Sequence, residues 1–368
     1  MPKNTKQFSL SQQKRALLAL EWSVGFRPAG SVWVLLLALR GFSLVEIGLA
    51  EAVFHMVSLC CELPSGLLAD VLGRKRTLAA SQAVFVLAAL LMTVSQGMGG
   101  VYLSLAFSAL AYNLESGTRE AMTYESMLQA GREGEYLKFS SLQNGVFRFS
   151  SGGAMLLAGG TVLLGWRMAY LLDAGIALTG LAAVLTMAEP DRDVPAVTLG
   201  TLPAALAGTV REAWALLRSD GAAVRIMTAN ALVGACATLT GFFLQEKVEA
   251  AVTVPALLGP ALFVLGLGGG LAGLLTGRLD RLSYPKAAAL AGGGVLLCAL
   301  AARSGGLPVL MASGLLAGLL DDSLQLVSDK RLNERFPSAQ RATLVSVSSM
   351  VFSLFMIPLS PVVGWWFS

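Results

Sequence analysis

The stretch that decides the fold is residues 66–76, which reads GLLADVLGRKR and joins two long apolar runs. Gly66 and Gly73 carry no side chain, so they permit a close approach of helices and a tight turn. Asp70 is suited to the positively charged N-terminal end of a neighbouring helix. The stretch therefore indicates a short polar connection between two packed helices, with basic residues at the edge of an apolar layer.

The amino-acid composition of the whole chain is much more apolar than that of a soluble protein. Of the 368 residues, 55% are hydrophobic and only 14% are charged, whereas soluble domains carry about 25% charged residues. This difference excludes an ordinary soluble enzyme, a disordered protein and a nucleic-acid binder. The single histidine and the four cysteines, which lie inside apolar runs, predict neither a metal site nor a disulfide framework. We expect no cofactor, and the polar N-terminus lacks a cleavable signal pattern.

Eleven apolar segments are long enough to cross a bilayer, which takes about 20 helical residues. Backbone polar groups cannot stay unpaired in lipid, so these segments must be helices. The predicted spans are 15–39, 44–69, 77–97, 101–127, 139–164, 167–188, 222–244, 255–276, 286–303, 307–329 and 342–363. The short connections between them favour a compact helical bundle.

The placement of the basic residues predicts the orientation of the spans. Of the 27 Lys and Arg residues, twenty fall in alternate connections, Arg74 and Lys75 among them, while four fall on the opposite side and three within spans. Positive charge collects on the cytoplasmic side of membrane proteins. We therefore expect a multi-pass protein of the cell membrane with its N-terminus in the cytoplasm.

The two parts of the chain resemble each other at a constant offset. The GLL at 66–68 recurs as GLL at 273–275, and at the same offset Glu115 falls on Asp322. Repeats of this kind are typical of transporters built from two related bundles around a central site.

This repeat predicts three parts: a six-helix bundle over 1–189, a cytoplasmic linker over 190–221 and a bundle of five helices over 222–368. The linker contains an apolar stripe that predicts an amphipathic helix on the inner membrane surface (Leu206, Val210, Trp214, Leu217). The second bundle has no counterpart of the first bundle's sixth helix. A twelfth helix is therefore missing from the pattern, either because the protein has eleven spans or, as we favour, because the sequence is truncated.

The 66–76 stretch resembles the loop signature of the major facilitator superfamily, G-x-L-a-D-x-x-G-R-[RK]. The segments ELPS at 62–65 and ALAYNLESG at 109–117 resemble bacterial drug-exporter-like members. The resemblance implies an all-α membrane protein of two pseudo-symmetric bundles that works by alternating access. It also implies a conformational latch in which Asp70 meets the start of the eleventh helix near Ala342. The latch residues would be Gly66, Asp70, Gly73, Arg74 and Lys75.

Polar and ionisable residues inside the spans are the candidate transport residues, because a charge at the centre of a membrane helix costs about 2.5–3.5 kcal/mol. The family arrangement implies that the first, fourth, seventh and tenth helices line the cavity. The predicted substrate- and proton-binding residues are Arg27, Glu115, Arg119, Glu120, Asn144, Arg148, Asp321, Asp322 and Gln325. Secondary cavity residues are Glu21, Phe26, Glu51, His55, Asn113 and Tyr124.

The acids in the spans outnumber the arginines, which favours protonation of some of the acids. We therefore expect a transporter rather than an enzyme, with proton-coupled antiport of a small amphipathic, cationic or zwitterionic compound. Asp321, Asp322 and Glu115 would form the coupling group. The expected partners are the substrate, protons and lipid, and the expected state is a monomer.

Three alternatives stay open at this stage. The helix over 139–164 has glycines but lacks the proline of the exporter signature, so uptake of an organic anion or nutrient is a rival. A second rival is an intramembrane aspartyl hydrolase that uses Asp321 and Asp322, whose side chains would point about 100° apart on a helix. A third is a sensor without transport activity.

Overall fold

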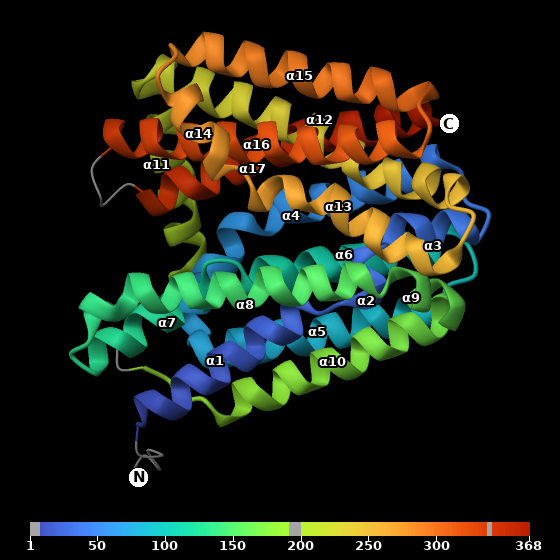
Figure 1. Ribbon diagram of the computed structural model, residues 1–368. Coiled ribbons are helices and arrows are strands. Elements are labelled where there is room, and N and C mark those ends of the chain that lie inside the picture. The colour runs from blue at the N-terminus through green and yellow to red at the C-terminus, as the bar shows by residue number, and fades with distance from the viewer. Residues whose placement is uncertain (1–7, 191–199, 337–340) are drawn as a thin grey trace. The chain divides into compact units, whose positions relative to one another are not determined.

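The computed structural model describes residues 8–190, 200–336 and 341–368, and every regular element in these ranges is a helix (Figure 1). The first part of the chain forms α1 (Leu10–Gly25), α2 (Pro28–Ser31), α3 (Trp33–Leu39), α4 (Leu44–Leu72), α5 (Arg74–Val94), α6 (Met98–Glu115), α7 (Thr118–Gln129), η1 (Glu133–Glu135), α8 (Tyr136–Leu156), α9 (Ala158–Leu164) and α10 (Trp166–Thr186). The remainder forms α11 (Leu202–Ser219), α12 (Gly221–Ala251), η2 (Pro255–Leu257), α13 (Leu258–Gly270), α14 (Gly273–Asp280), α15 (Tyr284–Ser304), α16 (Leu307–Arg335) and α17 (Arg341–Phe367).

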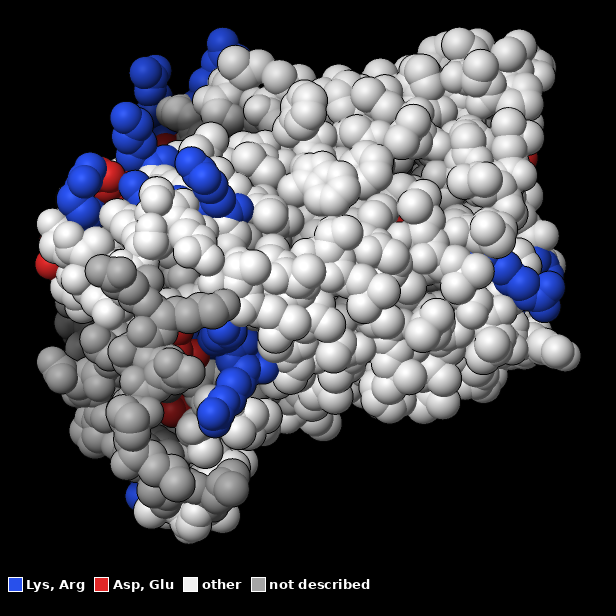
Figure 2. All heavy atoms as spheres, turned by 90° about the horizontal axis from the view of Figure 1, so that it is seen from below, with Lys and Arg blue, Asp and Glu red and all other residues white. Residues whose placement is uncertain are grey.

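The helices confirm a membrane protein but not the count of eleven spans. Among the described residues, eight helices are long and apolar enough to cross a bilayer, and nine if the α8–α9 pair, bent by 56°, is one span. On the face shown in Figure 2, most Lys and Arg side chains lie at one end and a smaller group lies at the opposite end, and the broad band between them has almost no charged side chain. Such a band is the surface expected to face lipid.

Breaks inside two predicted spans explain the lower count. The span predicted over 15–39 is divided into α1, α2 and α3, since α1 ends at Gly25 and Pro28 begins a new helix. The span predicted over 101–127 is divided at Gly117, whose φ of +71° interrupts the helix. Neither set of pieces contains a helix that passes the length and hydropathy requirement alone.

The chain divides into two compact units, each with its own core. Unit 1 consists of Met1–Ser31, Cys60–Ala154 and Leu164–Ala207; unit 2 consists of Val32–Leu59, Met155–Leu163 and Gly208–Ser368. The core of unit 1 is built around fully buried side chains such as Leu17, Leu78 and Met122. That of unit 2 joins α12, α15, α16 and α17.

Unit 2 includes two segments from the predicted first bundle because glycines bring their backbones against the second. Gly48 of α4 lies against Ser360 and Pro361 of α17, and Gly364 of α17 lies against the carbonyl of Leu44. The compact units therefore group the segments differently from the predicted parts 1–189, 190–221 and 222–368. That division remains a prediction about the repeat.

Helix α11 forms where the linker sequence predicts an amphipathic helix, but its buried face differs from the predicted stripe. Ala213 and Leu216 enter the core of unit 2, with Leu217 packed beside them. Val210 and Trp214, by contrast, are about half exposed. The exposed pair lies beside Arg218, whose guanidinium sits over the Trp214 ring, as expected for a helix at a membrane surface.

Close packing of α13 on α16 depends on glycine. A Cβ atom at Gly268 would lie against the carbonyl oxygen of Leu315 and the nitrogen of Leu319, while Gly314 of α16 accommodates Leu265 of α13. Small residues of this kind let membrane helices approach backbone to backbone. Gly266, on the same helix, has open space where its Cβ would be.

We predict that Gly268→Ala lowers the thermal unfolding temperature, because an added methyl group would force α13 and α16 apart at a cost of about 1–3 kcal/mol. Gly266→Ala is the matched control, since it changes the same helix where nothing obstructs a methyl group. Its unfolding temperature should equal or slightly exceed that of the wild type. Equal unfolding temperatures for the two variants in detergent would contradict the packing argument.

Candidate functional site

A buried ion-pair cluster in unit 1 is centred on Arg119. Its Nε atom lies 3.0 Å from Oε1 of Glu21, and Nη1 lies 2.8 Å from Oε1 of Glu115. Glu21 and Glu115 are only 3% and 8% exposed, so a single guanidinium compensates two buried carboxylates. Glu120 is more exposed and contacts Nη2 at 3.4 Å. These four predicted residues, from α1, α6 and α7, are thus brought together.

Amide side chains complete this Arg119 cluster. Gln82 of α5 donates to Oε2 of Glu115 at 3.0 Å, and Gln143 of α8 donates to Oε1 of Glu21 at 3.0 Å. Thr123 in turn donates to the amide oxygen of Gln143. The cluster therefore ties together five helices of unit 1, and its two buried carboxylates are hydrogen-bonded as well as charge-paired.

Arg27, also in unit 1, lies in the gap between α1 and α2. Its guanidinium carbon is 3.3 Å from the centre of the Phe85 ring, and its Nε and Nη2 atoms are buried without a hydrogen-bond partner. Asp173 of α10 accepts hydrogen bonds from the nitrogens of Ala29 and Gly30. Asp173 therefore holds the start of α2, whereas Arg27 keeps two unused donors.

A cavity of about 440 Å³ in unit 2 lies between α12, α16 and α17. A hydrogen-bonded chain runs along it: Asn230 donates to Gln325, and Gln325 donates to Asp329 at 2.8 Å. The lining is Met227, Asn230, Ala231, Gln325, Asp329, Leu332, Asn333, Leu344, Val345, Ser348, Ser349 and Phe352. We call this space the Asp329 cavity. Its polar atoms are amide, hydroxyl and carboxylate groups.

The aromatic wall of the Asp329 cavity connects to the membrane histidine. His55 lies edge-on to the Phe352 ring, with 5.6 Å between ring centroids. Its Nδ1 atom is 3.1 Å from Oγ of Ser353, and its Nε2 atom is 3.3 Å from Glu51. Glu51 and His55, predicted as a pair one turn apart on one helix, are therefore adjacent and buried behind this wall.

Asp321 is the middle residue of α16, two turns from Asp329 and on the same side of the helix. Its Oδ1 atom would be 3.2 Å from a Cβ atom at Gly234, which also faces the Phe352 ring at 3.4 Å. Asp321 thus lies near the wall of the Asp329 cavity, and neighbouring Asp322 is half-buried.

The 66–76 stretch forms the predicted turn, with contacts partly other than those expected. Gly73 has a φ of +95°, which a side chain would disfavour. Asp70 pairs with Arg74 at 3.0 Å, and Arg74 also pairs with Glu125. Glu189 accepts hydrogen bonds from the nitrogens of Arg74 and Lys75 and so caps α5.

Two expectations for this stretch stay predictions. Among the described residues, a Cβ atom at Gly66 would meet no atom within 4 Å, so the close helix approach expected there is not seen within unit 1. The expected partner of Asp70, the helix start near Ala342, belongs to unit 2, and the side chain of Ala342 lies outside the described residues. The latch role remains a prediction.

The other predicted site residues stand apart from these two clusters. Asn113 is buried and donates to the carbonyl of Ala109 in its own helix. Phe26 stacks on Trp22, and Tyr124 packs against Tyr136. Asn144 and Arg148 both lie exposed on α8.

Charge alone is an incomplete guide to this site. A search for ionisable residues finds Arg119 and its acids, but it overlooks the neutral partners Gln82 and Gln143 and the cavity residue Asn230. The signal that could have found them is an amide inside an otherwise apolar span, since such a group also needs a partner in lipid.

The comparisons with known proteins agree with this architecture. The model of the Major Facilitator Superfamily matches residues 23–301. The nucleoside transporter NupG has a similar structure, with a TM-score of 0.72 and 15% identity over 97% of this chain and 91% of that one. So has a D-xylose-proton symporter, with a TM-score of 0.66 and 14% identity over 96% and 88% of the chains. PepTSo2 is a third similar structure, with a TM-score of 0.67 and 14% identity over 97% of this chain and 94% of that one. No curated protein matches the sequence.

We predict that Arg119→Met strongly destabilises the protein, because it leaves the buried Glu21 and Glu115 without a cation. Removing one partner of a buried ion pair costs about 3–5 kcal/mol. The triple variant Arg119→Met, Glu21→Gln, Glu115→Gln should recover most of this loss, since neutral amides need no counter-ion. Thermal unfolding in detergent measures both effects. A single variant as stable as the wild type would show that these acids are already compensated elsewhere.

Proposed function

Because this chain belongs to the Major Facilitator Superfamily and is therefore a multi-pass membrane transporter, we propose that it works by alternating access. We further propose that it exchanges protons for a small amphipathic compound with a cationic or zwitterionic group. The Asp329 cavity is the observation that carries this proposal, and the carboxylates of both units supply the proton sites.

The lining of the Asp329 cavity suits a cation. None of its twelve residues is a lysine or an arginine. Asp329 supplies a carboxylate, and Asn230 and Gln325 supply amide oxygens, so a protonated amine would find acceptors only a few ångströms apart. Phe352 offers a ring face for the same charge, and the apolar side chains suit the rest of an amphipathic molecule.

The proton step is assigned to Asp321, Asp322 and Glu115. Adjacent carboxylates in a water-poor helix repel each other, so protonation of at least one of them is favourable. Asp321 is near the cavity wall, where arrival of a cation would favour loss of that proton. Glu115 shares Arg119 with Glu21.

One observation favours the rival function, which is uptake of a solute that carries an anionic group. Arg27 holds two buried donors without acceptors, and a guanidinium in this state is suited to a carboxylate. The structural neighbours named above are described as a nucleoside transporter and a proton symporter of xylose. A polar solute taken up with protons is therefore the second candidate.

Three further expectations belong to this proposal. The protein would lie in the cell membrane with its N-terminus in the cytoplasm, in agreement with the bias of Lys and Arg. It would function as a monomer. The 66–76 stretch would latch the cytoplasmic side through Asp70, with Arg74 and Lys75 keeping the turn in place.

We predict that purified protein is stabilised by cationic amphipathic compounds, and that Asp329→Asn weakens this binding about tenfold or more. Hydrogen bonds to charged groups contribute about 1.5–3 kcal/mol, and the variant removes the one charge in the cavity. Glu212→Gln is the matched control, because Glu212 is an exposed acid of α11 outside the cavity.

Thermal shifts measured with cationic, zwitterionic, neutral and anionic compounds give the affinity of each compound and show which chemical class the protein binds. The protein could instead be stabilised by anionic compounds and not by cations, and Arg27→Gln could abolish that stabilisation. This result would favour uptake of an anionic solute over exchange of protons for a cation. If Asp329→Asn binds cations as tightly as the wild type does, the Asp329 cavity is not the substrate site.

A further inference from the structure

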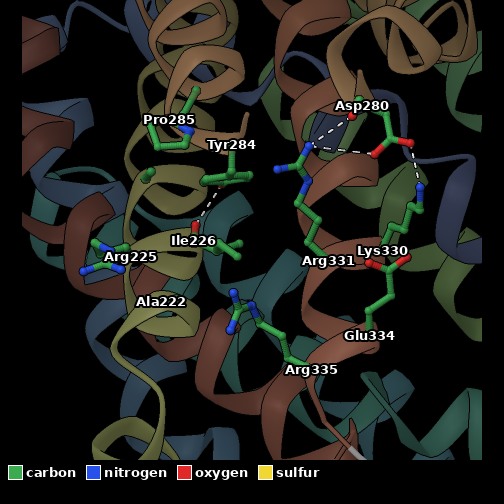
Figure 3. A pocket seen from close by; sticks show the side chains of 12 residues that line it. Ala222, Arg225, Ile226, Asp280, Tyr284, Pro285, Lys330, Arg331, Glu334 and Arg335 are labelled. Carbon is green, nitrogen blue, oxygen red and sulfur yellow. Dashed lines mark hydrogen bonds and ion pairs between the residues drawn. The ribbon is translucent and has the colours of Figure 1, made fainter. Parts of the chain in front are cut away.

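A second cavity in unit 2, of about 690 Å³, lies where the ends of α12, α14, α15 and α16 meet (Figure 3). Its charged lining consists of Arg225, Lys330, Arg331 and Arg335 against Asp280 and Glu334. Ala222, Ile226, Ala229, Tyr284, Pro285 and Ala288 complete it. Unlike the Asp329 cavity, this basic pocket has a predominantly cationic lining.

Most charges of the basic pocket are already paired within the protein. Asp280 lies 2.6 Å from Lys330 and 4.0 Å from Arg331. Arg331 also donates to the carbonyls of Asp280 and Leu282. Asp220, which precedes α12, pairs with Arg335 at 2.7 Å. Hydrogen bonds from Ala223 and Arg335 hold the pKa of Asp220 below its usual range, so this pair persists at neutral pH.

Arg225 and Glu334 are the exceptions, since in the part of the chain that the structure describes neither has an ion pair or a hydrogen bond. Glu334 is exposed on α16. Arg225 is exposed on α12. Figure 3 shows it on one side of the pocket, with Arg331 and Arg335 on α16 on the other. An anion seated between these helices would meet a free guanidinium on one side and further donors on the other.

Exposed leucines of α12 and α15 continue from the basic pocket along these two helices. Leu232 lies two turns from Arg225 on the same side of α12 and is 42% exposed. Leu296 lies three turns from Pro285 on the same side of α15 and is 61% exposed. Among the described helices, only α16 packs extensively on both α12 and α15, and it covers their other side.

We propose that the basic pocket binds the phosphate headgroup of an anionic phospholipid, with an acyl chain lying along the exposed leucines of α12 and α15. The charge of Arg225 complements a phosphate, which guanidinium groups bind through two parallel hydrogen bonds. The exposed leucines complement a hydrocarbon chain. Basic pockets between membrane helices at the cytoplasmic end are known to take such headgroups. A soluble phosphate compound would use Arg225 but not these leucines.

The test compares thermal stabilisation of the detergent-purified protein by phosphatidylglycerol, phosphatidylcholine and inorganic phosphate at equal concentrations. Phosphatidylglycerol should stabilise the wild type more than the other two. Arg225→Gln should weaken binding of phosphatidylglycerol about tenfold. Arg225→Lys keeps the positive charge and should weaken this binding less. Arg211→Gln, which removes an equal charge on α11 outside the pocket, is the control.

Three outcomes would overturn the proposal. Arg225→Gln could bind phosphatidylglycerol as well as the wild type does. Inorganic phosphate could protect as well as the lipid, which would indicate a site for soluble phosphates. The protein could also run as a dimer whose dissociation is promoted by Leu296→Ser, which would show that a second copy covers these leucines. Arg225 is exposed and unpaired, so its variants are expected to fold.

Discussion

The absence of water from the bilayer core is the constraint on which the rest of this structure depends. A charged group within a span must be compensated by the protein itself, because lipid offers no counter-ion. Arg119 meets this requirement for Glu21 and Glu115 at once, and Gln82 and Gln143 supply the remaining hydrogen bonds. Since these groups come from five helices, one electrostatic requirement fixes much of the packing of unit 1.

The same constraint separates structural charges from charges available for transport. Asp173 holds the start of α2, and Asp280 is paired with two cations, so neither has a free role. Asp329 has an amide partner and borders a cavity without a cation in its lining. A carboxylate at a cavity whose lining contains no cation is the group best able to exchange a proton for a cationic substrate.

The helical membrane architecture could be predicted from the sequence, because twenty apolar residues in succession permit few other structures. The local pair of Glu51 and His55 could also be predicted, since it follows from a spacing of four residues on one helix. Glu115 and Arg119, which are also four residues apart, pair across the break between α6 and α7. The breaks at Phe26 and Gly117 could not be predicted, because a continuous apolar run does not reveal where the helix will be interrupted, and the count of eleven spans is not confirmed.

Long-range partners were the second limit. Nothing in the local spacing of Glu189 shows that it caps α5, and neutral amides such as Asn230 are inconspicuous beside charges. For a related reason, the sequence did not show that Ala213 and Leu216 of α11 enter the core of unit 2.

The central claim is that carboxylates in the spans couple proton movement to transport of a cation. The most direct measurement is the pH change in a weakly buffered solution of purified protein when a cationic substrate binds. The account predicts proton release by the wild type and a sharp reduction in Asp321→Asn, Asp322→Asn or Glu115→Gln. Release equal to that of the wild type in all three variants would contradict the account and leave these acids with a structural role.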